Sequence, residues 1–241
     1  MTFDEAKSAL ATKLNISYSD IANNGRFTDS DLGLWVNLAC LQVWDLHPWD
    51  FTEIVKTITL TSDDITNGYI NYPTDVVSGS AQFVRVDSKM WVKRGYRSYL
   101  TTLENNTSAT DKIWSEMGRL IFFNTNATAA AGVLDLFGKK RFAKLSNTSD
   151  LLPFSPDTDD NEYSGNQAVI RLAFAEALGS EKMQNPNQAN TERQTALQIL
   201  ELLWKEFAQN RALDQQKDVP IFDVPDFFQG RSGSGNVPGT F

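Results

Sequence analysis

The chain has 241 residues, of which 41% are hydrophobic, and its 30 acidic and 22 basic residues give a formal net charge of −8. No run approaches the roughly 18–20 apolar residues that a membrane helix needs, so no membrane partner is expected. The first ten residues carry acids where a signal peptide would carry an apolar stretch, which favours synthesis in a cytoplasm. One cysteine and one histidine exclude an intrachain disulfide and leave too few ligands for a zinc site.

Two helices are predicted at the N-terminus. The first begins at Phe3, because Thr2 and Glu5 form a capping box, and the second follows the looser pair Thr28 and Asp31. Apolar residues then recur at helical spacing in the second helix: Leu32, Trp35, Val36, Ala39, Cys40, Val43 and Leu46.

The two residues with nucleophile or base chemistry lie in this second helix or at its end. Cys40 falls within the apolar stripe and is interpreted as a buried structural thiol. His47 precedes Pro48, which ends the helix, so it is expected to cap carbonyls or pack on Trp49 instead of acting as a catalytic base.

A β-rich insertion is predicted over residues 51–145. Its expected strands are residues 54–60, 69–72, 82–86, 89–92, 113–114, 120–123 and 133–137, with a short helix at 96–103. Turn signals predict three hairpins, around Asn67-Gly68, Asp87-Ser88 and Gly118.

The C-terminal part is predicted to be helical again. Residues 146–163 read as a linker with turn chemistry, followed by helices at about 165–182 and 186–213. The expected fold class is α+β, with residues 1–50 and 164–214 forming a four-helix body around the β insertion.

The last 27 residues, the C-terminal arm (215–241), change character. Pro220, Pro225 and Pro238 exclude a continuous helix, so an extended conformation is expected. The arm is rich in apolar residues that a disordered tail lacks: Val219, Ile221, Phe222, Val224, Phe227 and Phe228. Such a segment is predicted to bind in a groove, in its own subunit or in a partner.

Charge is distributed unevenly along the chain. Residues 1–80 carry a net −7, residues 81–145 a net +6 and residues 146–241 a net −7. The positive segment would contact nucleic acid, dock on an acidic part of a neighbouring copy, or balance its own flanks. Within it, four cations form a basic run that is a candidate DNA or subunit contact, or an exposed hairpin tip: Lys139, Lys140, Arg141 and Lys144.

Two short motifs resemble the head-to-tail adaptors of tailed bacteriophages. In those proteins a helix of the type W-x-N-x-A leads into P-W-x-F, and the matching residues here are Trp35, Asn37, Ala39, Pro48, Trp49 and Phe51. Residues 168–207 look like the paired C-terminal helices of that family. A tyrosine expected in the last helix is absent, and Leu203, Trp204 and Phe207 stand there instead.

The resemblance implies a structural virion protein of the phage neck. Such a protein forms a homo-oligomeric ring, typically twelvefold, between the portal and the tail or nozzle proteins. In that setting the C-terminal arm is expected to anchor to the portal or to an adjacent copy. Genomic DNA would pass through the ring without sequence-specific contacts. The family has no known catalysis, and no cofactor or metal is expected.

Two alternatives remain open at this stage. One is a tail-completion or tail-terminator protein, which would form the same kind of ring but contact different neighbouring proteins. The other is a hydrolase or lyase using carboxylates, for which the candidates are Asp157, Asp159, Asp160 and Glu162, or Asp63 with Asp64.

Overall fold

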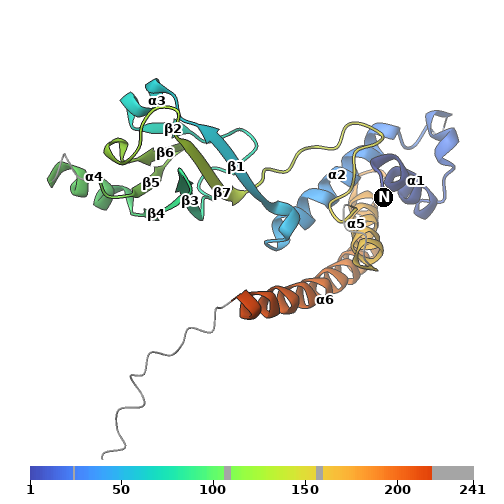
Figure 1. Cartoon of the computed structure of the whole chain (residues 1–241). Helices are drawn as coiled ribbons and strands as arrows, with labels where there is room; N and C mark the ends of the chain where they lie inside the picture. Colours follow the sequence, from blue (N-terminus) through green and yellow to red (C-terminus); the bar gives the residue numbers. More distant parts are fainter. Residues whose placement is uncertain (24, 106–109, 156–159, 219–241) are drawn as a thin grey trace, which may run out of the picture.

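The computed structural model describes residues 1–23, 25–105, 110–155 and 160–218 (Figure 1). Its α-helices are α1 (Phe3–Lys13), α2 (Asp29–Leu46), α3 (Ser62–Asn67), α4 (Tyr96–Asn105), α5 (Asp160–Gly179) and α6 (Pro186–Asp218). Its strands are β1 (Glu53–Thr59), β2 (Tyr69–Asn71), β3 (Phe83–Val86), β4 (Lys89–Lys93), β5 (Ile113–Met117), β6 (Leu120–Phe123) and β7 (Val133–Lys139). Short 3₁₀ turns cover Tyr18–Asn23, Asp50–Thr52 and Thr125–Ala127. The predicted α+β class is confirmed.

Local signals set the ends of the N-terminal helices. Thr2 and Glu5 form the predicted capping box of α1, and Thr28 and Asp31 form that of α2. The backbone N–H of Phe3 donates to the carbonyl of Asp150 at 2.7 Å, which ties the start of α1 to the segment before α5.

The helical core is built from α1, α2, α5 and α6, which gather at one end of the molecule (Figure 1). Alanines let α5 pack closely on its neighbours, and Gly165 near its start leaves room for the ring of Phe154. The fully buried alanines of this core are Ala6, Ala11, Ala39, Ala168, Ala173, Ala177 and Ala196.

The seven strands form one curled, mixed sheet at the other end, in the order β1-β7-β3-β4-β5-β6-β2. Only the β4–β5 pair is parallel. The concave inner face carries a second core that includes Trp91, Trp114, Phe123 and Leu136. The hairpins around Asp87-Ser88 and Gly118 are confirmed, and these residues adopt the positive φ angles that such turns require.

The predicted hairpin at Asn67-Gly68 is wrong. Thr61 and Asp64 form a capping box that starts α3, and Gly68 ends this helix in a left-handed conformation with φ of 73°. Strand β2 therefore pairs with β6, at the sheet edge opposite β1.

Two boundaries also differ near the C-terminus. Helix α5 begins at Asp160, so residues 160–163 are helical and not part of the linker. Helix α6 continues to Asp218, because residues 214–218 contain no proline, so the first four residues of the predicted C-terminal arm are helical. In the part of the chain that the structure describes, no helix combines the length and the apolar character needed to cross a membrane.

Candidate interaction surfaces

The outer face of the sheet carries an uncovered apolar row. Along β1, β7 and β3 alternate side chains point away from the inner core. Val55 lies opposite Phe137, and Phe83 lies on the other side of Phe137, so the three form one row across three strands. Val55 is 52% exposed and Phe83 is 37% exposed. Large apolar side chains therefore face solvent at the middle of a strand ladder.

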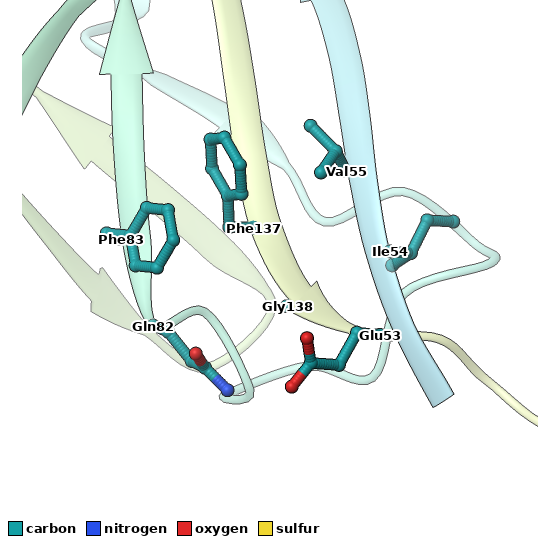
Figure 2. A pocket seen from close by; sticks show the side chains of 7 residues that line it. All are labelled: Glu53, Ile54, Val55, Gln82, Phe83, Phe137 and Gly138. Carbon is teal, nitrogen blue, oxygen red and sulfur yellow. The ribbon is translucent and has the colours of Figure 1, made fainter. Parts of the chain in front are cut away.

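This row surrounds a hollow of about 150 Å³, here called the sheet hollow. Figure 2 shows the rings of Phe83 and Phe137 side by side, and their centroids lie 4.3 Å apart with 32° between the planes. The lining consists of Glu53, Ile54, Val55, Gln82, Phe83, Phe137 and Gly138. The two polar side chains, Glu53 and Gln82, lie together at one end, so the hollow has an apolar wall and a polar rim (Figure 2).

A fixed polar row adjoins the apolar one. The hydroxyl of Thr57 donates to Asp135 Oδ1 at 2.7 Å, and Arg85 donates from Nε and Nη2 to Asp135 Oδ2 at 3.0 and 2.8 Å. The hydrogen bond from Thr57 and the ion pair with Arg85 lower the pKa of Asp135. The carboxylate thus stays charged and paired, and it marks one boundary of the apolar row.

The apolar character continues onto β4. Met90 lies directly opposite Arg85 and is 55% exposed, and Val92, two residues further along the same strand face, is 57% exposed. An exposed apolar surface spanning several strands is typical of an interaction site in a soluble protein.

A second uncovered apolar surface lies on α2. Leu34, Leu38 and Leu41, here called the leucine stripe, follow helical spacing and are 50%, 36% and 39% exposed. The opposite side of the same helix is buried in the core. The leucine stripe is therefore an apolar surface that no described element covers.

Beside this stripe, a shallow hollow of about 330 Å³ opens between α2, α5 and α6. It is lined by Gln42, Asp45, Leu46, Leu172, Arg193, Leu197 and Leu200. Gln42 and Arg193 both donate to Glu176, at 2.8 and 2.9 Å, which holds the polar edge of the hollow in place.

The basic run lies at the end of β7 and in the chain that returns to the helices, so it is not a hairpin tip. Lys139 forms an ion pair with Asp45 of α2 at 3.0 Å. For this residue, an acid from the N-terminal segment of the same chain therefore balances the positive charge, which is one of the three alternatives left open by the sequence. The side chains of Lys140, Arg141 and Lys144 are exposed. Three cations therefore remain available for a contact with DNA or protein.

Backbone hydrogen bonds hold this return segment in place. The N–H of Lys140 donates to the carbonyl of Thr52 at 2.6 Å, and the indole of Trp44 donates to the carbonyl of Lys140 at 3.0 Å. Phe142 packs edge-on against Trp44 with centroids 5.6 Å apart. The exposed cations thus project from a segment with fixed backbone partners.

The apolar residues predicted to bind a partner lie outside the described residues. These are Val219, Ile221, Phe222, Val224, Phe227 and Phe228. Helix α6 ends directly before them, at Asp218.

The single thiol and the single imidazole have structural surroundings. Cys40 is fully buried, and desolvation raises the pKa of its thiol to about 12, so the nucleophilic thiolate is suppressed. His47 packs on Trp49, as expected, and also stacks on Trp204 with centroids 4.9 Å apart. Its Nε2 lies 3.1 Å from the carboxylate of Glu201.

Of the carboxylate candidates, the structure describes the side chains of Asp63 and Asp64, which both lie in the first turn of α3. Asp64 accepts a hydrogen bond from the N–H of Thr61 and starts α3, while Asp63 is exposed on the same helix. Asp157 and Asp159 lie outside the described residues, and Asp160 begins α5. Among the residues that the structure describes, no group of three His, Cys, Asp or Glu side chains is arranged to hold a metal ion.

Sequence reasoning missed both exposed apolar surfaces. The leucine stripe had a visible signal, since Leu34, Leu38 and Leu41 fall outside the core stripe of a helix that already had one apolar side. The sheet hollow had none, because Val55, Phe83 and Phe137 meet only through the register of three strands that are distant in sequence.

The sequence matches no protein-family model, and none of the curated proteins compared with it is a match.

Proposed function

We propose that this chain is a structural subunit of a ring in the neck of a tailed bacteriophage, acting as the head-to-tail adaptor between portal and tail. The observation that carries the proposal is the presence of two different exposed apolar surfaces, the leucine stripe and the face around the sheet hollow. The resemblance of the α2 region to adaptor proteins gives the type of assembly.

Two unlike surfaces on one chain favour head-to-tail association. A symmetric dimer uses the same patch on both subunits, whereas a ring joins one patch to a different patch on the next copy. The leucine stripe lies on the helical side and the sheet hollow on the strand side of the molecule (Figure 1). Each copy therefore has a surface for each of its two neighbours, and the adaptor family implies about twelve copies.

The net negative charge of the chain supports a channel through which DNA passes without being bound tightly. The chain has a net charge of −8, so most of its surface repels phosphate. The exposed cations Lys140, Arg141 and Lys144 form a local exception, and a ring of such groups positions the DNA backbone without reading its sequence.

Assembly of the full chain tests this function. Purified protein is analysed by native mass spectrometry and electron microscopy, alone and after incubation with tailless heads of the phage that encodes it. We expect closed rings seated on the portal vertex. A protein that stays monomeric and also fails to bind these heads would overturn the proposal, and binding at the distal tip of a tail tube would favour a tail-terminator role.

A matched pair of variants tests the carrying observation. Leu38→Glu places a charge in the leucine stripe, whereas Leu202→Glu places one on α6 at a leucine that is 66% exposed and lies outside the stripe. We expect Leu38→Glu to lose ring formation and Leu202→Glu to retain it, with both proteins folded by circular dichroism. Equal assembly of the two variants would remove the leucine stripe from the interface.

A further inference from the structure

The sheet hollow needs an occupant that is apolar, narrow and long enough to cross several strands. Its aromatic wall is exposed, and no described element of the chain covers it. The strongest match lies within the chain itself, directly after α6.

We propose that residues 219–228 of one copy bind across the outer sheet face of a neighbouring copy, with one phenylalanine ring in the sheet hollow. The assignment to a neighbouring copy rests on the ring proposed above, in which the leucine stripe of the copy that supplies the segment would pack over the bound segment and the rest of the sheet face. The identity of the bound segment rests on the size of the hollow, the length of the chain after α6 and charge.

The size of the hollow suits one aromatic ring. At about 150 Å³ it matches the volume at which an apolar cavity in a protein holds benzene. Segment 219–228 supplies three phenylalanines, Phe222, Phe227 and Phe228. The rings of Phe83 and Phe137 form the wall, so an inserted ring gains edge or offset contacts in addition to its burial.

The length of the segment suits the width of the apolar surface. Ten extended residues span at most about 33–36 Å. Four adjacent strands from β1 to β4 cover about 14 Å, because strands lie about 4.8 Å apart. The segment therefore crosses the whole apolar row and reaches Met90 and Val92.

Helix α6 extends well beyond the helical core. Helix α6 has 33 residues and its partner α5 has 20, so a stretch of about 20 Å has no counterpart in α5. Among the residues of α6 whose side chains the structure describes, none after Leu200 is fully buried. Figure 1 shows the end of α6 standing away from α1, α2 and α5. A helix that projects in this way carries the following residues away from the helical core, and in the proposed ring a neighbouring copy would lie within their reach.

Charge favours a long-range attraction between the two segments. Residues 219–228 contain Asp223 and Asp226 and no base, whereas residues 81–145 carry a net charge of +6 as a whole. On the docking face itself Arg85 is already paired with Asp135, and Glu53 lines the hollow. The opposite net charges of the two segments speed the formation of the apolar contact.

Disulfide trapping with the full chain tests the contact. One protein carries Val55→Cys at the sheet hollow, and a second carries Phe222→Cys, Phe227→Cys or Phe228→Cys. The native Cys40 is fully buried, so the new thiols react selectively. We expect mixing and mild oxidation to give a covalent dimer with at least one of the three. Its yield should exceed that of a Met117→Cys control by about ten-fold or more, since docking raises the effective thiol concentration to the millimolar range.

Met117 is a matched control because it is 57% exposed in the same sheet, on β5. A double variant with both cysteines in one chain shows whether the bound residues 219–228 come from the same chain or from a neighbouring copy. An intrachain disulfide without any interchain product would overturn the neighbouring copy as recipient. Equal yields at Val55 and Met117 would overturn the binding site.

The same samples separate this inference from the proposed function. Rings on phage heads with no trapped disulfide would leave the adaptor function standing and remove the docking of residues 219–228. An interchain disulfide in a protein that does not bind heads would support the docking and count against the adaptor function.

Discussion

The helical and β regions of this protein differ in how completely they bury their apolar side chains. In the helical region α5 is surrounded by α1, α2 and α6, and its apolar side chains are covered on several sides. In the β region the sheet curls around one inner core. Helix α4 covers its outer face at β5 and β6, and the outer face stays open over β1, β7 and β3. The largest exposed apolar row of the helical region is therefore confined to one side of α2, whereas in the β region it extends across three neighbouring strands.

The two regions keep separate cores but share a junction. Asn37 of α2 is buried and binds both backbone groups of Leu145, with its amide donating to the carbonyl at 3.1 Å and its oxygen accepting from the N–H at 2.8 Å. Trp44 and Asp45, about two turns further along α2, bind Lys140 and Lys139. The return segment is thereby fixed along α2, and the orientation of the sheet depends on this helix.

The largest expected effect comes from Trp114, at the centre of the sheet core, which is fully buried. Trp114→Ala should lower the free energy of unfolding by about 3–5 kcal/mol. Hydrogen exchange should show loss of protection in β4–β6 while α5 stays protected. An equal loss in α5 would show that the two cores unfold as one unit.

Trp114→Phe is the matched control for that cavity. The indole Nε1 of Trp114 is buried without a hydrogen-bond partner among the described residues, so phenylalanine removes an unsatisfied donor while keeping most of the volume. The free energy of unfolding, measured in urea, should fall much less in Trp114→Phe than in Trp114→Ala.

The corresponding change in the helical core is Gly165→Ala. A Cβ at this position would lie 2.3 Å from Cγ of Phe154, so the ring has to move, at an expected cost of about 1–3 kcal/mol. Gly179→Ala, at the other end of α5, meets nothing within 4 Å and should be neutral or stabilising. Thermal unfolding of both variants checks this, and equal melting temperatures would contradict the close packing of Phe154.

The junction is tested by Asn37→Leu, which leaves both backbone groups of Leu145 without their side-chain partner. We expect a loss of about 1–3 kcal/mol in urea unfolding, and faster hydrogen exchange in residues 140–145. Ser30→Ala on the same helix removes an exposed hydroxyl and should change stability by less than about 0.5 kcal/mol. If the two variants behaved alike, Asn37 would not join the two regions.

The smallest effect concerns Asp135 on the outer face of the sheet. Its pKa is lowered in the folded state, so its charged form stabilises the protein at neutral pH, and this contribution is lost as the pH falls below about 4. Asp135→Asn should cost at most about 1 kcal/mol at pH 7, and the difference from the wild type should shrink between pH 5 and pH 3. Asp63→Asn, at an exposed acid of α3, serves as the control, and a constant difference across this range would contradict the assignment.

Some of the fold follows from short stretches of sequence. The capping boxes at Thr2 and Thr28 and the positive-φ turn at Asp87-Ser88 are local hydrogen-bond and steric preferences, so the elements they bound were predicted within a few residues. The error at Gly68 has the same origin. An Asn-Gly pair suits a hairpin and a helix end equally well, and the capping residues Thr61 and Asp64 favoured the helix.

The sequence by itself determined every α-helix except α3, and most strands, because each depends on neighbours within about four residues. It also determined the uneven charge, which is a matter of composition alone. Only the tertiary structure decided that β2 pairs with β6, that Val55, Phe83 and Phe137 share one hollow, and that the leucine stripe stays uncovered. Strand order and register depend on pairing between distant segments, and exposure depends on which faces other elements cover. Neither quantity can be read from the spacing of residues along one element.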